Sequence, residues 1–188
     1  REEWFPSDVL STLTLRGSYG TAGNVPSYSA QYETYTIGSG GTLTAATLGN
    51  PQLRPEVVTE VEVGADFELY QRYGLSITYA NSLSKDQILP VPIPVATGFP
   101  TQWQNAGELR NQTWEGSLTL PVVRNRGGLT WTARANYTQN RTVVEKLNVE
   151  PFYIGTGLQA TGDVLRVEEG ERYGAIHGRV FMTRCNQL

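Results

Sequence analysis

VVTEVEVGADFELY, residues 57–70, is the stretch that decides the fold of this chain. Every second residue is apolar or small: Val57, Thr59, Val61, Val63, Ala65, Phe67 and Leu69. The residues between them are mostly polar or tiny: Glu60, Glu62, Gly64, Asp66 and Glu68. Because side chains alternate across a strand, this pattern predicts one strand of about 46 Å with an apolar and an acidic face. Ordinary strands have about five or six residues, so such a strand favours a membrane-spanning β-barrel.

The same alternation recurs along the chain and predicts further long strands. The expected strands lie at residues 13–19, 75–80, 106–122 and 129–143, with a possible short strand at Asp163–Val167. Beyond Glu145 the pattern is otherwise irregular. The chain is therefore predicted to be an antiparallel meander of long amphipathic strands.

The connections between these strands alternate in length. Residues 21–55 and 90–105 are rich in Gly, Ser and Pro and are expected to be long loops. Four prolines, Pro90, Pro92, Pro94 and Pro100, argue against a central strand in the second loop. Residues 71–74 and 123–128 form short turns instead. Short turns at one rim and long loops at the other are typical of outer-membrane barrels.

Composition excludes several other classes of protein. Only 39% of the 188 residues are hydrophobic, the mean hydropathy is −0.34, and no window approaches a transmembrane helix. Barrel strands carry apolar residues only at alternate positions, so low mean hydropathy is compatible with a membrane barrel. The net charge is −3 without a basic stripe, which argues against nucleic-acid binding.

No residue set predicts a cofactor, a metal site or catalysis. Cys185 and His177 are each the only residue of their type, which excludes an internal disulfide and makes a zinc site implausible. Glu60 and Glu62 lie about 7 Å apart along the strand, a pair that a glycoside hydrolase could use. Asp66 and Glu68 continue the same row, which favours a hydrated wall. The chain is therefore not expected to be an enzyme.

Five stretches carry recognisable motifs in order along the chain: LTLRGSYGTAGN (13–24), NPQLRPEVVTEVEVGADF (50–67), GLSITYANSLSKDQILPVPIPVATGF (74–99), NAGELRNQTWEGSLTL (105–120) and EEGERYGAIHGRVF (168–181). Together they resemble TonB-dependent outer-membrane receptors, more narrowly the SusC/RagA-type importers. The second resembles the family's "NP-x-L-x-PE" signature, the third its "K-D-x-I/L" run, and the fourth its "NAG" stretch. Their order makes the resemblance specific, although each motif alone is weak.

Four positions depart from the family pattern. Trp114 stands where the family usually has an apolar residue, and Thr113 where it favours glycine. Arg172 replaces a proline, and the stretch from His177 lacks the usual aromatic run. The departures at Arg172 and His177 leave the strand pairing after residue 145 open.

The resemblance implies a fragment of a transmembrane β-barrel of about 22 strands. Residues 1–188 would be a partial barrel domain, without the plug domain and the remaining strands. Such receptors import nutrients such as oligosaccharides or peptides across the bacterial outer membrane. The implied partners are outer-membrane lipid, a SusD-like surface lipoprotein, a glycan or peptide ligand, and the TonB complex through a missing N-terminal part.

Two groups of residues are candidates for function. Aromatic side chains in the long loops could stack on sugars or bury peptide side chains; they are Tyr28, Tyr32, Tyr35, Phe99 and Trp103. Mutual packing of the loops is the alternative role for these rings. Polar residues of the strands are expected to face the barrel lumen; they are Arg16, Glu60, Glu62, Asp66, Glu68, Glu115 and Arg134.

A soluble extracellular β-sandwich for binding or adhesion is the main alternative, and a glycan hydrolase a weaker one. A sandwich must cover the apolar face with a second sheet, for which the sequence shows no second strand set. The start, REEWFPSD, has no apolar core of a signal peptide, so the chain is expected to be part of a longer polypeptide. Alone, it is not expected to insert into a membrane or conduct ions.

Overall fold

The computed structural model describes residues 9–154 and 165–177. Several features of the sequence lie outside these ranges. They are the opening residues REEWFPSD, the first part of the expected strand at Asp163–Val167, the last part of the motif at 168–181, and Cys185.

The chain divides into two compact units. The first, here called the wall unit, comprises Arg1–Gly23, Val57–Ser84 and Arg110–Thr142. The second, the loop unit, comprises Asn24–Glu56, Lys85–Leu109 and Val143–Leu188. Both units are built mainly from strands.

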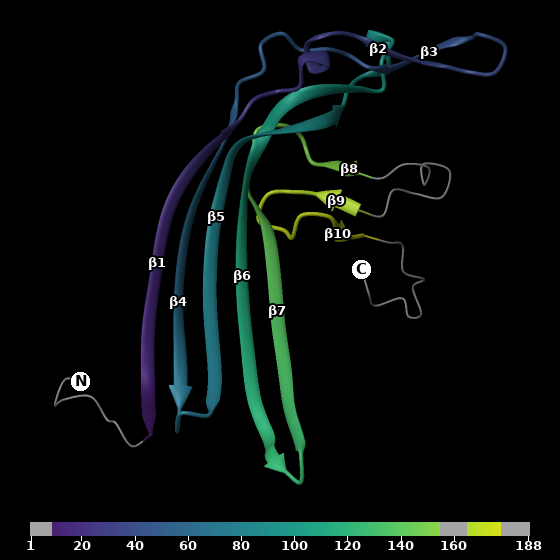
Figure 1. Ribbon diagram of the computed structural model, residues 1–188. Coiled ribbons are helices and arrows are strands. Elements are labelled where there is room, and N and C mark those ends of the chain that lie inside the picture. The colour runs from purple at the N-terminus through teal and green to yellow at the C-terminus, as the bar shows by residue number, and fades with distance from the viewer. Residues whose placement is uncertain (1–8, 155–164, 178–188) are drawn as a thin grey trace, which may run out of the picture. The chain divides into compact units, whose positions relative to one another are not determined.

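Five long strands form the main sheet, in the order β1-β4-β5-β6-β7 (Figure 1). Their bounds are Leu10–Asn24 for β1, Glu56–Leu69 for β4, Tyr73–Pro92 for β5, Thr101–Arg126 for β6 and Leu129–Leu147 for β7. The predicted all-β meander of long strands is thereby confirmed. Among the described residues, no helix has the length and apolarity needed to cross a membrane.

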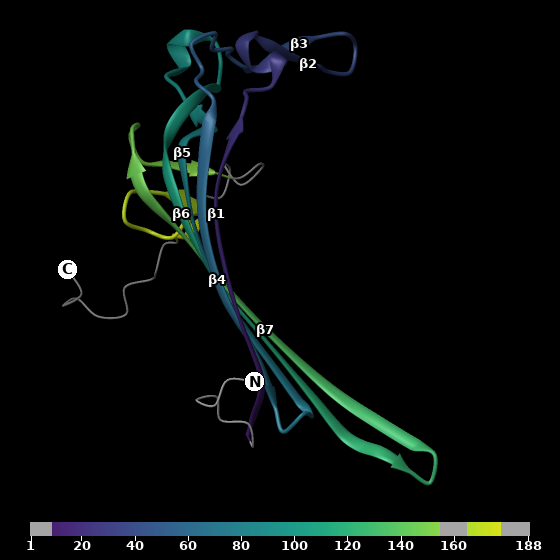
Figure 2. The same ribbon diagram turned by 60° about the vertical axis from the view of Figure 1, so that its left-hand side comes forward.

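Two tight turns join neighbouring strands within the wall unit (Figure 2). Between β4 and β5, Arg72 N–H donates to the carbonyl of Leu69 over 3.0 Å, and Tyr70 and Gln71 have φ of 52° and 51°. Between β6 and β7, Gly127 and Gly128 have φ of 61° and 86°. Positive φ at both central residues is the type I′ hairpin geometry, which matches the twist of the flanking strands.

One face of the wall unit is apolar and open. Hydrogen bonds of Arg16 to Asp66, Ser76 and Thr78 define the opposite, polar face. Alternation then places large exposed apolar residues on the other face: Leu13, Leu15, Tyr19, Val57, Val61, Val63, Ile77, Trp114, Val122, Leu129, Trp131 and Tyr137. Leu15 is 73% exposed and Trp131 57%, so within residues 9–154 and 165–177 no second sheet covers this face as a soluble sandwich would require.

The loop unit contains more regular structure than the sequence predicted. Residues 21–55 were expected to be irregular, but they hold the 3-10 turn η1 (Tyr28–Gln31) and the hairpin of β2 (Thr34–Ile37) and β3 (Leu43–Thr47). Another 3-10 turn, η2, spans Val95–Thr97. Beyond residue 145 a small sheet forms in the order β10-β9-β8, from Ala175–Ile176, Leu165–Val167 and Phe152–Ile154.

The expectation that prolines end the third strand before residue 90 is wrong. β5 runs through Pro90 to Pro92, and β6 starts at Thr101 rather than near Ala106. β4 begins only at Glu56, whose side chain lies beside Gln87. The end of β5 therefore has a neighbour on one side only, and there the missing N–H of proline is tolerated.

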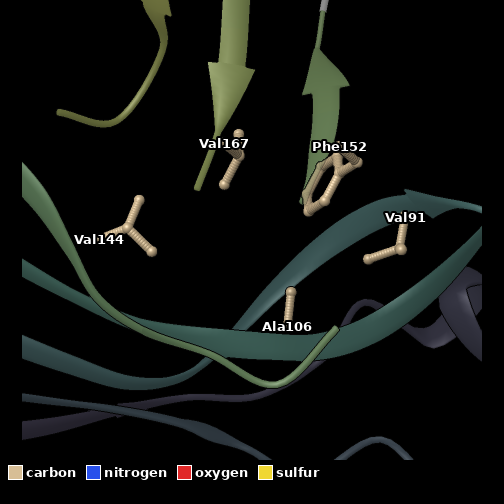
Figure 3. Close-up of a cluster of buried hydrophobic side chains, with 5 residues drawn as sticks. All are labelled: Val91, Ala106, Val144, Phe152 and Val167. Atoms are coloured by element: carbon tan, nitrogen blue, oxygen red, sulfur yellow. The ribbon is translucent and has the colours of Figure 1, made fainter. Parts of the chain in front are cut away.

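The small sheet is held by a cluster of buried side chains in the loop unit (Figure 3). Phe152 of β8 and Val167 of β9 point toward the strands below them, where the cluster is completed by Val91, Ala106 and Val144. Ala106 and Val167 are fully buried, and Phe152 is only 6% exposed. This cluster is the core of the loop unit.

Candidate functional site

Residues 24–56, here called the loop module, are attached along the start of β6. Leu48 N–H donates to the carbonyl of Thr101 over 2.8 Å, and Leu48 forms a parallel bridge with Gln102. Gln102 Nε2 donates to the carbonyl of Gly49 over 3.3 Å, and Thr101 Oγ1 donates to that of Ala46 over 3.4 Å. Residues 46–49 of the module are thus held on the start of β6 by backbone and side-chain hydrogen bonds.

The 3-10 turn η1 packs directly on Gly49 and Asn50. A Cβ at Gly49 would lie 2.5 Å from the carbonyl group of Gln31 and from the carbonyl carbon of Tyr32. Asn50 N–H donates to the carbonyl of Ala30 over 2.9 Å, and Ala30 is buried. Only glycine at position 49 allows this approach, which fixes η1 against Gly49 and Asn50.

Asn50 satisfies its side-chain amide inside the module. Its Oδ1 accepts from the N–H of Gln52 over 3.0 Å, which is the Asx-turn geometry. Its Nδ2 donates to the carbonyl of Trp103 over 3.0 Å. The turn at residues 50–53 is therefore tied to β6 at a second point.

A third attachment joins residue 54 to both β5 and β6. Asn105 Oδ1 accepts from Arg54 N–H over 2.9 Å, and Asn105 Nδ2 donates to the carbonyl of Arg54 over 3.0 Å. The same Nδ2 donates to the carbonyl of Asp86 over 2.7 Å. The Arg54 guanidinium lies 2.6 Å from the Asp86 carboxylate. Asp86 has φ of 55°, a left-handed conformation that Asp tolerates better than most residues.

The loop module ends at a buried carboxylate. Glu56, the first residue of β4, is 9% exposed, and its Oε2 accepts from Gln87 Nε2 over 3.2 Å. A buried carboxylate needs such a donor because desolvation penalises its charge. The junction of module and strand is thereby fixed on β5.

Four of the five candidate aromatics form two ring pairs, and Trp103 belongs to neither pair. Tyr28 and Tyr32 have ring centroids 5.3 Å apart, and their hydroxyls are 3.1 Å apart. Tyr35 contacts Phe99 edge-on at 5.6 Å. Trp103 is half-buried at the start of β6, where its backbone N–H donates to the carbonyl of Leu48. The Tyr35–Phe99 pair packs two loops together, whereas Tyr28 remains 77% exposed.

A groove of about 460 Å³ runs beside Tyr28. Its lining is formed by Val25, Pro26, Ser27, Tyr28, Gln31, Asn50, Pro51 and Leu53. The mixture of apolar side chains, one exposed ring and backbone could receive a side chain or a sugar ring.

Two tyrosines of the module have perturbed acidity. The hydrogen bond between the Tyr32 and Tyr28 hydroxyls raises the pKa of the Tyr32 phenol above its ordinary value, and desolvation adds to it. The hydrogen bond of Tyr35 to the Glu33 carboxylate, 3.0 Å long, raises the pKa of Tyr35, with smaller effects from desolvation and from the Glu33 charge. Both phenols therefore keep their protons at neutral pH.

The polar candidates of the strands lie in the wall unit and only partly contact one another. Arg16 Nε is 2.9 Å from Asp66 Oδ2, and Ser76 Oγ donates to Asp66 Oδ1 over 2.5 Å. Thr12 Oγ1 donates to Glu68 over 3.2 Å. Glu60 is exposed and Glu62 half-buried, with no third acidic or metal-binding neighbour among the described residues.

Glu115 lines a shallow polar recess of about 230 Å³ on the wall unit. Its other lining residues are Ser76, Thr78, Gly116, Ser117, Asn136, Tyr137 and Thr138. Glu115 and Arg134 form no ion pair within the described part of the chain, and both residues are exposed.

The β-barrel model described as TonB dependent receptor-like matches residues 3–167. The chain belongs to this family. "TonB-dependent receptor P3" of Formosa agariphila is 31% identical over 92% of the chain, and "TonB-dependent receptor P39" of the same organism is 30% identical over 90%. The chain spans 18% and 16% of the lengths of these two relatives.

Solved structures give the same assignment. The RagAB peptide transporter superposes with a TM-score of 0.68 and 26% identity over 87% of this chain and 18% of its own. The RagAB peptide importer in its "open-open" state gives a TM-score of 0.64 at 27% identity, with the same coverage of both chains. The resemblance to SusC/RagA-type receptors and the barrel fold are thereby confirmed. TonB-dependent receptors are transporters rather than enzymes, which agrees with the expected lack of catalysis.

Three of the TonB-dependent receptor motifs in this chain meet at one place in the loop unit. Asn50, Arg54 and Glu56 come from NPQLRPE, Asp86 from the KD run, and Asn105 from NAG. Sequence reasoning noted these residues only as signatures and did not assign them a role. The sequence signal was that these residues all lie in motifs resembling those of the family. The sequence itself gave no indication of the hydrogen bonds between them, because the three motifs lie far apart in the chain.

Proposed function

We propose that this chain supplies part of the wall and the extracellular loops of a TonB-dependent importer in a bacterial outer membrane. The observation that carries the proposal is the wall unit, whose apolar face is exposed while its other face is hydrogen-bonded and polar. In a closed barrel the apolar face meets lipid and the polar face lines the lumen. Arg16, Asp66 and the acidic residues of β4 would then be lumen residues.

The ligand would be captured by the loop unit before passage through the lumen. The exposed Tyr28, its partner Tyr32 and the neighbouring groove offer a stacking surface for a nutrient such as a peptide or an oligosaccharide. The RagAB neighbours, described as a peptide transporter and a peptide importer, support a peptide as the ligand class.

The partners follow from the same family. Outer-membrane lipid would surround the apolar face of the wall unit. A SusD-like surface lipoprotein would cover the loops, and the TonB complex would act through a part of the receptor outside residues 1–188. The RagAB structures support the lipoprotein partner in general terms.

Site-directed spin labelling of the full-length receptor in bilayers tests the wall assignment. Single cysteines at Val61 and Val63 should carry labels relaxed mainly by oxygen, which concentrates in lipid. Labels at Glu60 and Glu62 should be relaxed mainly by a water-soluble nickel complex. Equal accessibility of both sets to the nickel complex would refute a lipid-facing strand.

Substitution in the full-length receptor tests ligand capture by the loops. Tyr32→Ala and Trp103→Ala should weaken uptake of tryptic casein peptides or of malto-oligosaccharides at limiting concentration. Tyr153→Ala is the matched control, because Tyr153 is also an exposed aromatic of the loop unit but lies on β8. Unchanged uptake of both ligand pools by the two variants would exclude a binding role for these rings.

A further inference from the structure

Residues 50–56 of the loop module are attached to β5 and β6 by hydrogen bonds rather than by buried apolar side chains. Among residues 50–56, only Glu56 is buried, and Asn50 and Leu53 are half-buried. The segment is held by hydrogen bonds to β5 and β6 instead. Segments with few buried apolar contacts open locally at low free energy. We therefore expect the hydrogen bonds to β5 and β6 to determine how often this module detaches.

Asn105 is the centre of this attachment. Its amide binds both the N–H and the carbonyl of Arg54, as a neighbouring strand would, and its Nδ2 also holds the carbonyl of Asp86. Three of its four hydrogen-bonding sites are thus used on two different segments. An aspartate in place of Asn105 can accept from the Arg54 N–H but cannot donate to either carbonyl. A leucine can neither donate nor accept.

The ion pair beside it is the weaker contact despite its short distance. The Arg54 side chain is 68% exposed and that of Asp86 31% exposed, so water screens their attraction. Exposed pairs of this kind contribute little to stability. The left-handed backbone of Asp86 matters more, since its carbonyl is a second acceptor for Asn105.

We propose that Arg54, Asp86 and Asn105 form a latch that holds the loop module on the ends of β5 and β6, with Asn105 as its positioning residue. The inference rests on the proposed function in one respect: the module that the latch holds carries the tyrosines assigned to ligand capture. Opening the latch would release the segment on which η1 packs, and with it the Tyr28–Tyr32 pair.

Hydrogen exchange in the full-length receptor, reconstituted in bilayers, tests the latch directly. Asn105→Asp keeps the acceptor for Arg54 N–H and loses both donated bonds. Two lost bonds should speed exchange of the Leu48 and Asn50 amides by about 10- to 100-fold. Amides of β4 in the wall unit should exchange at the wild-type rate.

Two further variants separate the backbone latch from the ion pair. Arg54→Ala removes the guanidinium and keeps every backbone bond to Asn105, so loop exchange should change by less than about threefold. Asn136→Asp makes the same chemical change as Asn105→Asp at an exposed position of β7 and should leave loop exchange unchanged. If Asn105→Asp fails to fold, Asn105→Gln retains the amide on a longer side chain and should also speed exchange.

The outcomes decide the proposal and distinguish it from the proposed function. Loop exchange that stays at the wild-type rate in Asn105→Asp, or that rises equally in β4, overturns the latch. An effect of Arg54→Ala as large as that of Asn105→Asp overturns the role of Asn105. Half-saturation of peptide uptake should rise in Asn105→Asp while maximal uptake is retained. Absence of uptake in the wild type would refute the proposed function, whereas the exchange result would still decide the latch.

Discussion

Phe152→Ala should detach the small sheet of β8, β9 and β10 from the strands beneath it. Phe152 is 6% exposed and packs with Val91, Ala106, Val144 and Val167 (Figure 3). A phenylalanine side chain buries about 200 Å², which at about 25 cal/mol per Å² stabilises by roughly 4–5 kcal/mol. Truncations of buried aromatic residues cost about 3–5 kcal/mol, in agreement with this figure.

Val167 and two backbone hydrogen bonds, from Val144 N–H to the Glu171 carbonyl and from Gly170 N–H to the Val144 carbonyl, also hold this part of the chain. The strands of the small sheet have only three, three and two residues. We therefore expect local detachment rather than unfolding of the whole receptor. Hydrogen exchange of the β9 amides in the full-length receptor should rise by more than about a hundredfold in Phe152→Ala.

Tyr153→Ala is the matched control for this experiment. Tyr153 is the next residue of β8, and it is 41% exposed, with the Arg166 guanidinium 6.0 Å from its ring centroid. It should lose no more than about 1 kcal/mol, since exposed cation–π contacts are weak. The reasoning would be refuted if both variants changed β9 exchange equally, or if Phe152→Ala left it unchanged.

Three further predictions concern single positions. Gln71→Gly should stabilise the receptor against urea by about 1 kcal/mol, because Gln71 adopts φ of 51° and glycine does so without steric cost. Gly107→Ala should destabilise it by at least about 3 kcal/mol in the same urea titration, because the new Cβ would overlap the carbonyl oxygen of Lys146. Glu33→Gln should lower the pKa of Tyr35, seen by ultraviolet titration against Tyr35→Phe. Because the folded pKa is raised, the stabilisation by this contact is complete below about pH 10, the ordinary tyrosine pKa, and is lost as pH rises through the raised value.

The long strands were predictable because each has one apolar face. Alternation identified β4 almost to the residue, from Val57–Tyr70 in the sequence to Glu56–Leu69 in the structure. It underestimated β6, which spans 26 residues from Thr101 to Arg126. A membrane needs only about 9–11 residues of a tilted strand, and beyond it both faces can be polar. No apolar alternation then marks the rest of the strand.

The loop module was not predictable for a different reason. Its shape depends on Gly49 meeting the backbone of Gln31 and on Asn105 meeting the backbone of Arg54, contacts between positions distant in the sequence. The aromatic residues of the loops were found by composition, but which rings pair was not. Tyr35 and Phe99 meet because two separate loops lie together, and no local pattern encodes that contact.

The amide of Asn105 recognises the main chain of residue 54 and ignores its side chain. An anchor of this kind works with any residue that can take up the same backbone conformation there. The hairpin and turn upstream of Gly49 could therefore be exchanged for a loop of different length and sequence, and the new loop would still seat on the same strands. Binding specificity could then diversify in this receptor without a redesign of the barrel that carries it.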